Sequence, residues 1–161
     1  LVFLQFRYCN QRIIWCERIQ TIHEEKVMYT YFVKSVDRVV DGDTIDISID
    51  LGFDLTKKER VRLAGIDTPE KRTKDLAEKK MGYQATEFLE MHLLEATKLT
   101  VKTEKDGKFG RMLGWLYKSE EDTKSINQIM IDKGYAWSYD GGTKEKNLED
   151  LMAKRGKSDG V

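Results

Sequence analysis

Cysteine and long apolar runs are scarce in this sequence of 161 residues. Its two cysteines, Cys9 and Cys16, both precede residue 17, so the rest of the chain holds neither a disulfide framework nor a cysteine metal site. No apolar run approaches the roughly 18 residues that a membrane span requires. The apolar start is interrupted at Arg7, which leaves it too short for the core of a signal peptide. Neither membrane insertion nor secretion is indicated, and a cytoplasmic location is the default expectation.

An excess of charge of either sign is also absent. The 28 basic and 28 acidic residues cancel, although 35% of all residues are charged. Proteins that hold nucleic acid by its backbone usually carry a basic excess, because neutralising phosphates drives their non-specific affinity. The overall charge therefore does not indicate a nucleic-acid-binding protein, and any such role has to come from a local site.

The length suits one domain with its own hydrophobic core, and Met28 is the first methionine of the chain. Residues 1–27 show no clean period of two or 3.6 residues. The codons of residues 24–26 are purine-rich, as in a bacterial ribosome-binding site. We therefore expect residues 1–27 to be either upstream, non-native sequence or an ordinary flexible extension. Residues 28–155 form the predicted domain, and residues 156–161 are expected to be a disordered tail.

Five segments have the pattern of short strands. Residues 31–40 are rich in β-branched and aromatic types, and residues 44–49 alternate apolar with polar after an Asp-Gly turn, which predicts a hairpin. A third strand is expected over residues 60–66 and ends before Pro69, the one proline of the chain. The remaining strands are expected over residues 98–103 and 112–117.

Apolar residues recur at helical intervals after the third strand and again near the end of the chain. After a lysine-rich loop at residues 71–83, a helix is expected around residues 85–93, and a second one is expected to end at Gly134. A short third helix is predicted within residues 143–155, with Leu148, Leu151 and Met152 facing inward. Five strands and about three helices predict an α+β, β-rich fold, a small five-stranded barrel of the oligonucleotide-binding (OB) type.

Several polar residues fall where this predicted barrel turns, and each alone is most often a solvated turn or a strand exit. Together they match the needs of phosphodiester hydrolysis. Carboxylates bind a hard cation such as Ca²⁺, guanidinium groups bind the charged transition state, and a further carboxylate accepts a proton from water. Asp43 and Asp67 are the candidates for binding the cation, and Arg62 and Arg111 are the candidates for binding the phosphate. Glu70 is the candidate for accepting the proton.

The order and spacing of these residues resemble the staphylococcal nuclease, or thermonuclease, domain family. The resemblance covers about residues 33–152 and rests on four motifs: Asp43 in the first hairpin, the block at residues 62–70, the Gly-Arg pair at residues 110–111, and Asn127 early in a helix. It implies Ca²⁺ held by Asp43, Asp67 and the Thr68 carbonyl, with Glu70 as general base and Arg62 and Arg111 as phosphate ligands. It also implies cleavage of DNA and RNA to 3′-phosphate products. Little sequence specificity is expected, because the sequence shows no helix or arm suited to reading bases.

The expected substrate contacts are Lys108, Tyr117 and Tyr139, the tyrosines as stacking partners for bases. Phe109 stands where the family prefers tyrosine, so one hydroxyl contact is absent. For Trp115, stacking on a base and a place in the barrel core are both open. The lysine run that starts at Lys71 either guides the substrate electrostatically or is a solvated loop.

The alternative to a nuclease is a non-catalytic module of the same fold that binds nucleic acid or protein. Such copies lose carboxylates or arginines, and this chain retains all of them. We therefore expect a monomeric Ca²⁺-dependent phosphodiesterase that acts on DNA and RNA and prefers single strands.

Overall fold

The computed structural model describes residues 28–104, 112–142 and 146–158. The expectations for residues 1–27, Lys108, Phe109 and Arg111 lie outside these residues, as does the end of the predicted tail.

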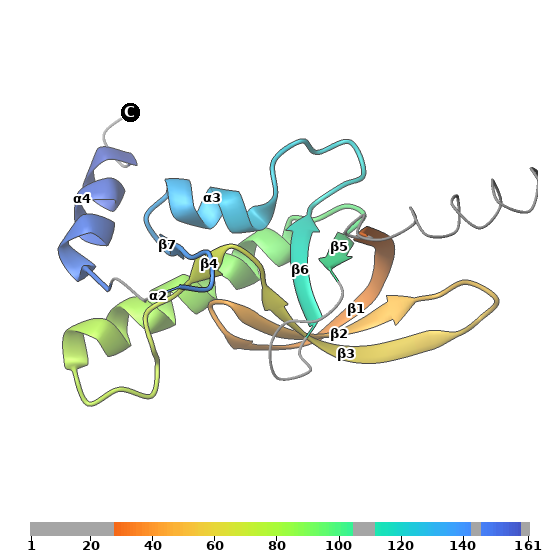
Figure 1. Cartoon of the computed structure of the whole chain (residues 1–161), viewed down its shortest axis with the longest axis horizontal. Helices are drawn as coiled ribbons and strands as arrows, with labels where there is room; N and C mark the ends of the chain where they lie inside the picture. The colour runs from red at the N-terminus through yellow and green to blue at the C-terminus, as the bar shows by residue number, and fades with distance from the viewer. Residues whose placement is uncertain (1–27, 105–111, 143–145, 159–161) are drawn as a thin grey trace, which may run out of the picture.

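The strands close into a five-stranded barrel in the order β1-β2-β3-β6-β5 (Figure 1). β1 (Met28–Asp41), β2 (Thr44–Asp50) and β3 (Thr56–Leu63) form an antiparallel meander, and β5 (Thr100–Glu104) pairs with β6 (Met112–Tyr117). The barrel closes because β1 also pairs with β5 and β3 runs parallel to β6. The predicted β-rich α+β fold, a five-stranded barrel of the OB type, is confirmed.

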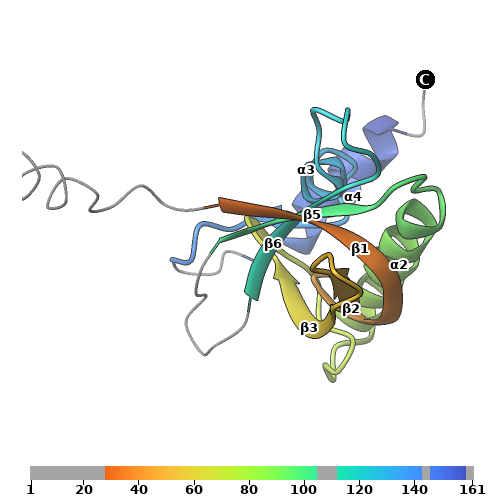
Figure 2. The same ribbon diagram turned by 90° about the vertical axis from the view of Figure 1, so that its right-hand side faces the viewer.

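β1 reaches both of its neighbours because it bends strongly. Its first five residues pair with β5 and its later residues with β2, as Figure 2 shows where the strand curves around the barrel. The register to β2 shifts three times, the last time between Val39 and Asp41. Such bulges bend a strand and leave one residue outside the ladder.

The barrel interior is filled by β-branched and leucine side chains. Ile45, Ile47, Val61, Val101 and Leu116 have no exposed surface. Burying a side chain of this kind stabilises a fold by about 1.5–3 kcal/mol. Val61 and Leu63 point inward and Arg60 and Arg62 outward, as the alternation of β3 predicts.

The third strand begins and ends earlier than predicted. β3 ends at Leu63, and the chain turns at Gly65, whose φ of 76° favours glycine. It then enters β4 (Ile66–Asp67), which pairs with β7 (Trp137–Ser138) in a separate two-stranded sheet. The prediction of one strand over residues 60–66 was therefore wrong, and the turn brings Asp67 back toward β3.

The predicted loop at residues 71–83 is shorter than expected, because α2 (Leu76–Leu94) already begins within it. The Asp75 carboxylate caps the helix by accepting the N–H of Ala77 at 2.8 Å. Met81 and Gly82 are buried, and Ala85 and Leu89 enter the barrel core. The helix thus continues back to the turn that follows Asp67.

Two helices complete the fold. α3 (Ile126–Asp132) follows the N-cap Ser125 and, as predicted, does not pass Gly134, the glycine after the C-cap Lys133, whose φ is 73°. α4 (Leu148–Ser158) continues past Arg155 and lies beside α2, where the Arg155 guanidinium donates to Gln84 Oε1 at 2.6 Å. Leu151 of α4 is fully buried. Met152 is 53% exposed, so its predicted inward position was wrong.

None of the helices in the described part of the chain combines the length and apolar character that crossing a bilayer requires.

Candidate active site

Three of the predicted residues meet at the rim of the barrel. The Arg62 guanidinium bridges two carboxylates, with Nη1 2.8 Å from Asp43 Oδ2 and Nη2 3.0 Å from Asp67 Oδ1. The side chains of Asp43 and Asp67 are 9% and 4% exposed, and that of Arg62 is 18% exposed. Two carboxylates this deeply buried repel each other, and the positive charge of the guanidinium between them compensates this repulsion. The site is therefore built around charges of both signs.

Backbone pairing holds Asp43 in this position. Thr44 lies opposite Arg62 in the β2–β3 ladder, and the Leu63 N–H donates to the Asp43 carbonyl at 2.8 Å. The Thr44 hydroxyl donates to Asp43 Oδ1 at 2.8 Å, so one oxygen of this carboxylate faces the ladder and the other faces Arg62.

Gly42 brings the first hairpin against the turn after β4. A Cβ at Gly42 would lie 3.0 Å from both the Thr68 hydroxyl oxygen and the Ala85 Cβ, a distance that real Cβ atoms rarely show. Thr68 is buried, with 3% exposure. The hairpin tip, Thr68 and α2 are therefore in direct contact, which places Thr68 beside the carboxylate pair.

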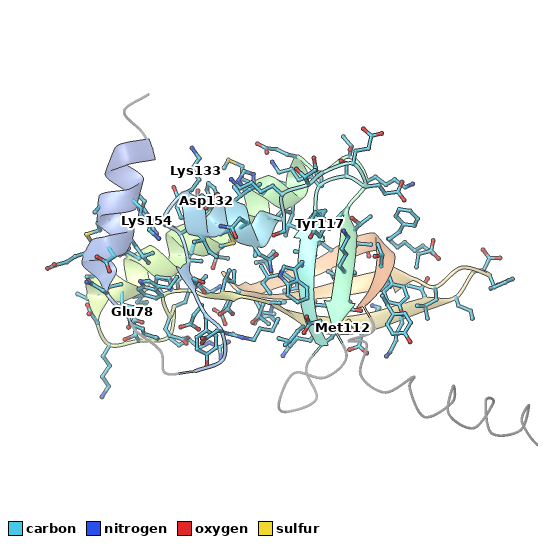
Figure 3. The ribbon with its side chains drawn as sticks, turned by 45° about the horizontal axis from the view of Figure 1, so that its top comes forward. Glu78, Met112, Tyr117, Asp132, Lys133 and Lys154 are labelled. Atoms are coloured by element: carbon cyan, nitrogen blue, oxygen red, sulfur yellow. The ribbon has the colours of Figure 1, made fainter. Side chains whose placement is uncertain are left out.

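Glu70 lies on the same turn, but its side chain is exposed. Its backbone N–H donates to Glu78 Oε1 at 3.4 Å, a long hydrogen bond, and Lys146 Nζ lies 3.2 Å from the same oxygen. Burial raises the pKa of Glu78, but these hydrogen bonds outweigh it and the net pKa is lowered. Glu78, labelled on α2 in Figure 3, thus remains a carboxylate that supports the Glu70 backbone. Sequence reasoning missed Glu78, because nothing in its local pattern indicates this contact.

Arg111 lies outside the described residues, but its neighbour in the chain is placed. Met112 pairs with Val61, and Leu113 pairs with Arg62. The chain therefore enters β6 next to the position of Arg62.

Asn127 joins the elements that carry these residues. Its amide nitrogen donates to the carbonyls of Ala64 at 2.8 Å and Gly114 at 3.0 Å, and its amide oxygen accepts the Leu116 N–H at 3.1 Å. The side chain is 2% exposed. The sequence motif singled out this residue, and the structure shows that it fixes α3 to β6 and to the β3–β4 turn.

A hollow of about 280 Å³ opens beside Arg62 and is lined by Leu113, Trp115 and Tyr139, among others. The Tyr139 N–H donates to the Gly65 carbonyl at 2.9 Å. Trp115 is half-buried on the outer face of β6, so it is not part of the barrel core. Among the predicted aromatic contacts, Tyr139 therefore shares this hollow with Arg62.

Tyr117 does not line this hollow. It lies at the opposite end of β6 from Met112 (Figure 3), and Lys102 Nζ sits 4.6 Å from the centre of its ring. Four residue steps, from Leu113 to Tyr117, span about 13 Å along a strand.

The donor chemistry of the rim fits a hard cation. Among the described residues no group of three or more His, Cys, Asp or Glu side chains is arranged so that it could hold a metal ion. The carboxylate pair of Asp43 and Asp67 would therefore need backbone and water oxygens to complete a coordination shell. Ca²⁺ accepts such mixed oxygen ligands in irregular geometry, and the Thr68 backbone lies next to the pair.

A closed OB-type barrel with an arginine-bridged carboxylate pair at its rim places the chain among small barrel proteins with a polar, acid-containing site. The sequence profile of the family described as Staphylococcal nuclease homologue matches residues 60–158. This match covers more than half of the chain, which therefore belongs to the staphylococcal nuclease family.

Individual relatives agree with this assignment. An uncharacterized endonuclease of Escherichia coli O157:H7 is 35% identical over 103 residues, which cover 64% of this chain and 58% of that protein. A thermonuclease of Staphylococcus intermedius is 39% identical over 93 residues, with 57% and 51% covered. A micrococcal nuclease of Shigella flexneri is 32% identical over 114 residues, with 67% and 59% covered. The chain thus spans somewhat more than half the length of these relatives.

Proposed function

We propose that the chain is a Ca²⁺-dependent nuclease that hydrolyses phosphodiester bonds of DNA and RNA with little sequence specificity. The observation that carries this proposal is the pair of buried carboxylates, Asp43 and Asp67, bridged by Arg62 at the barrel rim. Stability does not require such a group, since replacing buried ion pairs by apolar residues is often neutral or stabilising. Family membership adds support, because several relatives carry nuclease names.

In this proposal each site residue has its own role, and for Arg111 the role comes from the sequence motif alone. Asp43, Asp67 and the Thr68 carbonyl would hold Ca²⁺, which when bound would supply a Lewis acid that polarises oxygen ligands. The exposed Glu70 carboxylate accepts the proton of the attacking water as general base. Arg62 uses two of its five N–H donors on the carboxylates, which leaves donors for phosphate oxygens, and Arg111 acts as a second phosphate ligand.

The hollow beside Arg62 favours the proposal that the substrate is single-stranded. Tyr139 and Trp115 line it and offer aromatic faces on which an unpaired base can stack. Lys108 provides a further phosphate contact in this proposal. Tyr117 would have to act farther along the strand, because it lies at the other end of β6.

The direct test is digestion of end-labelled single-stranded DNA and RNA by the purified chain, with Ca²⁺ and then with a calcium chelator. We expect cleavage with Ca²⁺, none with the chelator, and products that end in a 3′-phosphate. Titration of Ca²⁺ against Asp43→Ala is expected to show weakened cation binding, since one of two carboxylate ligands is removed. Intact DNA that still binds the protein in Ca²⁺ would support the non-catalytic module instead, and 5′-phosphate ends would contradict the proposed direction of cleavage.

A further inference from the structure

Lys71 is the residue after Glu70, and its side chain is largely buried, with 17% exposure. Its ammonium donates to the Val40 carbonyl at 2.6 Å and lies 3.5 Å from Asp41 Oδ1. The ring centre of Tyr83 is 5.9 Å away. A lysine that only steers substrate would keep its charge in water, because burying an ammonium is costly without partners.

The partner of Lys71 is available because of the last bulge in β1. The register between β1 and β2 shifts between Val39 and Asp41, so Val40 is the residue left out of the ladder. A half-buried carbonyl without a ladder partner needs another donor, and the Lys71 ammonium provides it. The contact joins segments 31 residues apart, and Val40 lies three residues before Asp43.

The other side of the same turn is held by α2. A Cβ at Gly82 would lie 2.6 Å from the Pro69 carbonyl oxygen and 2.9 Å from the Glu70 carbonyl carbon, so the turn backbone lies directly on the helix. The turn at residues 69–71 is thus held at two places. Its backbone lies against Gly82 of α2, and the Lys71 side chain bonds to the hairpin that carries Asp43.

We propose that Lys71 is a positioning residue for the reaction, because its bond to the Val40 carbonyl ties the turn that carries Glu70 to the hairpin that carries Asp43. This inference rests on the proposed function and adds to it a residue that touches neither cation nor substrate. Arg72, Lys74 and Lys80 of the same run do not share the role, since their side chains are exposed.

The test compares Lys71→Met with Lys74→Met, which removes the same charge from an exposed position in the same turn. With single-stranded DNA at saturating Ca²⁺, Lys71→Met is expected to lower kcat about tenfold or more with KM within about twofold, because the general base is displaced while substrate contacts remain. Lys74→Met is expected to leave both parameters within about twofold of wild type. Lys71→Arg, which keeps a cationic donor of similar reach, is expected to recover most of kcat.

Hydrogen exchange over residues 68–75 gives a second readout that does not depend on activity. Lys71→Met is expected to speed exchange in this segment, and Lys74→Met is not; Lys71→Gln serves the same purpose should the methionine variant not fold. A raised KM with unchanged kcat would identify Lys71 as a substrate-guiding lysine and overturn the inference. Equal effects of the two methionine variants, or unchanged exchange, would also overturn it.

The two proposals fail separately. A wild-type chain that leaves DNA intact in Ca²⁺ refutes the proposed nuclease and with it the catalytic part of this inference. The exchange comparison still decides whether Lys71 anchors the turn.

Discussion

At the scale of single residues, Arg62 combines a structural function with a proposed catalytic one. It neutralises two carboxylates that are almost fully buried, and in the proposed reaction it also binds a phosphate. Arg60, two residues earlier on the same strand, pairs with Asp46 at 2.6 Å, but its side chain is 53% exposed. The two arginines thus form a matched pair with opposite environments.

Arg62→Gln is therefore expected to destabilise the metal-free protein by about 3–5 kcal/mol, the range for removing one partner of a buried ion pair. Ca²⁺ is expected to restore part of this loss, because a cation between the carboxylates replaces the missing charge. Arg60→Gln serves as control, with an expected loss of less than about 1 kcal/mol and no dependence on Ca²⁺. Urea unfolding of both variants, with Ca²⁺ and with chelator, measures the difference. Similar losses in the two variants would show that the rim charges are not coupled.

Glu70 offers the opposite case, because an exposed side chain contributes little to stability. Glu70→Gln is expected to lower kcat by about 10²–10⁴, the usual contribution of a general base, while the free energy of unfolding changes by less than about 0.5 kcal/mol. Arg111→Ala is expected to lower turnover by several powers of ten as well. Steady-state kinetics and urea unfolding measure both effects, with the exposed Glu87→Gln on α2 as control. Activity within about tenfold of wild type in either variant would contradict the role assigned to it.

At the scale of elements, Asn127 shows how α3 supports a site that it does not enter. Asn127→Ala removes three hydrogen bonds and leaves buried backbone groups of Ala64, Gly114 and Leu116 with fewer partners. The expected cost is about 2–4 kcal/mol, since each unsatisfied buried group costs about 1–3.

The control for this prediction is the next residue of the same helix. Gln128 is exposed and bonds Asp132, so Gln128→Ala is expected to change stability by no more than about 0.5 kcal/mol. Denaturant unfolding compares the two, and equal losses would mean that the buried amide does not hold the elements together. Activity of Asn127→Ala is expected to fall too, because the β3–β4 turn places Asp67.

The same elements show what the sequence can predict. The first hairpin was predicted well because an Asp-Gly turn and alternating residues are local signals, and the barrel and the end of α3 at Gly134 were predicted from similar patterns. The first turns of α2 were missed because charged residues fill them and the buried positions are only Met81 and Gly82. β4 and β7 were missed because two-residue strands have no period.

The site residues, too, were predicted where the sequence carries a local signal and missed where it does not. The order of its motifs singled out Asp43, Arg62 and Asp67, which the structure brings together. The contacts that support the site join residues far apart in the chain, such as Lys71 with Val40 and Glu78 with Lys146, and no local pattern encodes them.

At the scale of the whole molecule, the chain is unusual for a proposed nuclease because its charges cancel. In the proposed function, affinity for a nucleic acid then depends on the few cations assigned to the substrate, because the chain as a whole carries no excess of positive charge.

Binding of single-stranded DNA is expected to depend weakly on salt. Each neutralised phosphate contributes a slope of about −0.7 to a plot of log K against log salt concentration, so contacts from Arg62, Lys108 and Arg111 predict a total of about −2. Fluorescence anisotropy with the Glu70→Gln variant in Ca²⁺, whose cleavage is expected to be slow, measures this slope over a series of potassium chloride concentrations. Arg111→Ala is expected to reduce its magnitude by about 0.7, whereas Lys80→Met, at an exposed position on α2, is expected to leave it unchanged. A slope near −5 would instead require a long basic track across the surface, because three cations are too few to release that many counterions.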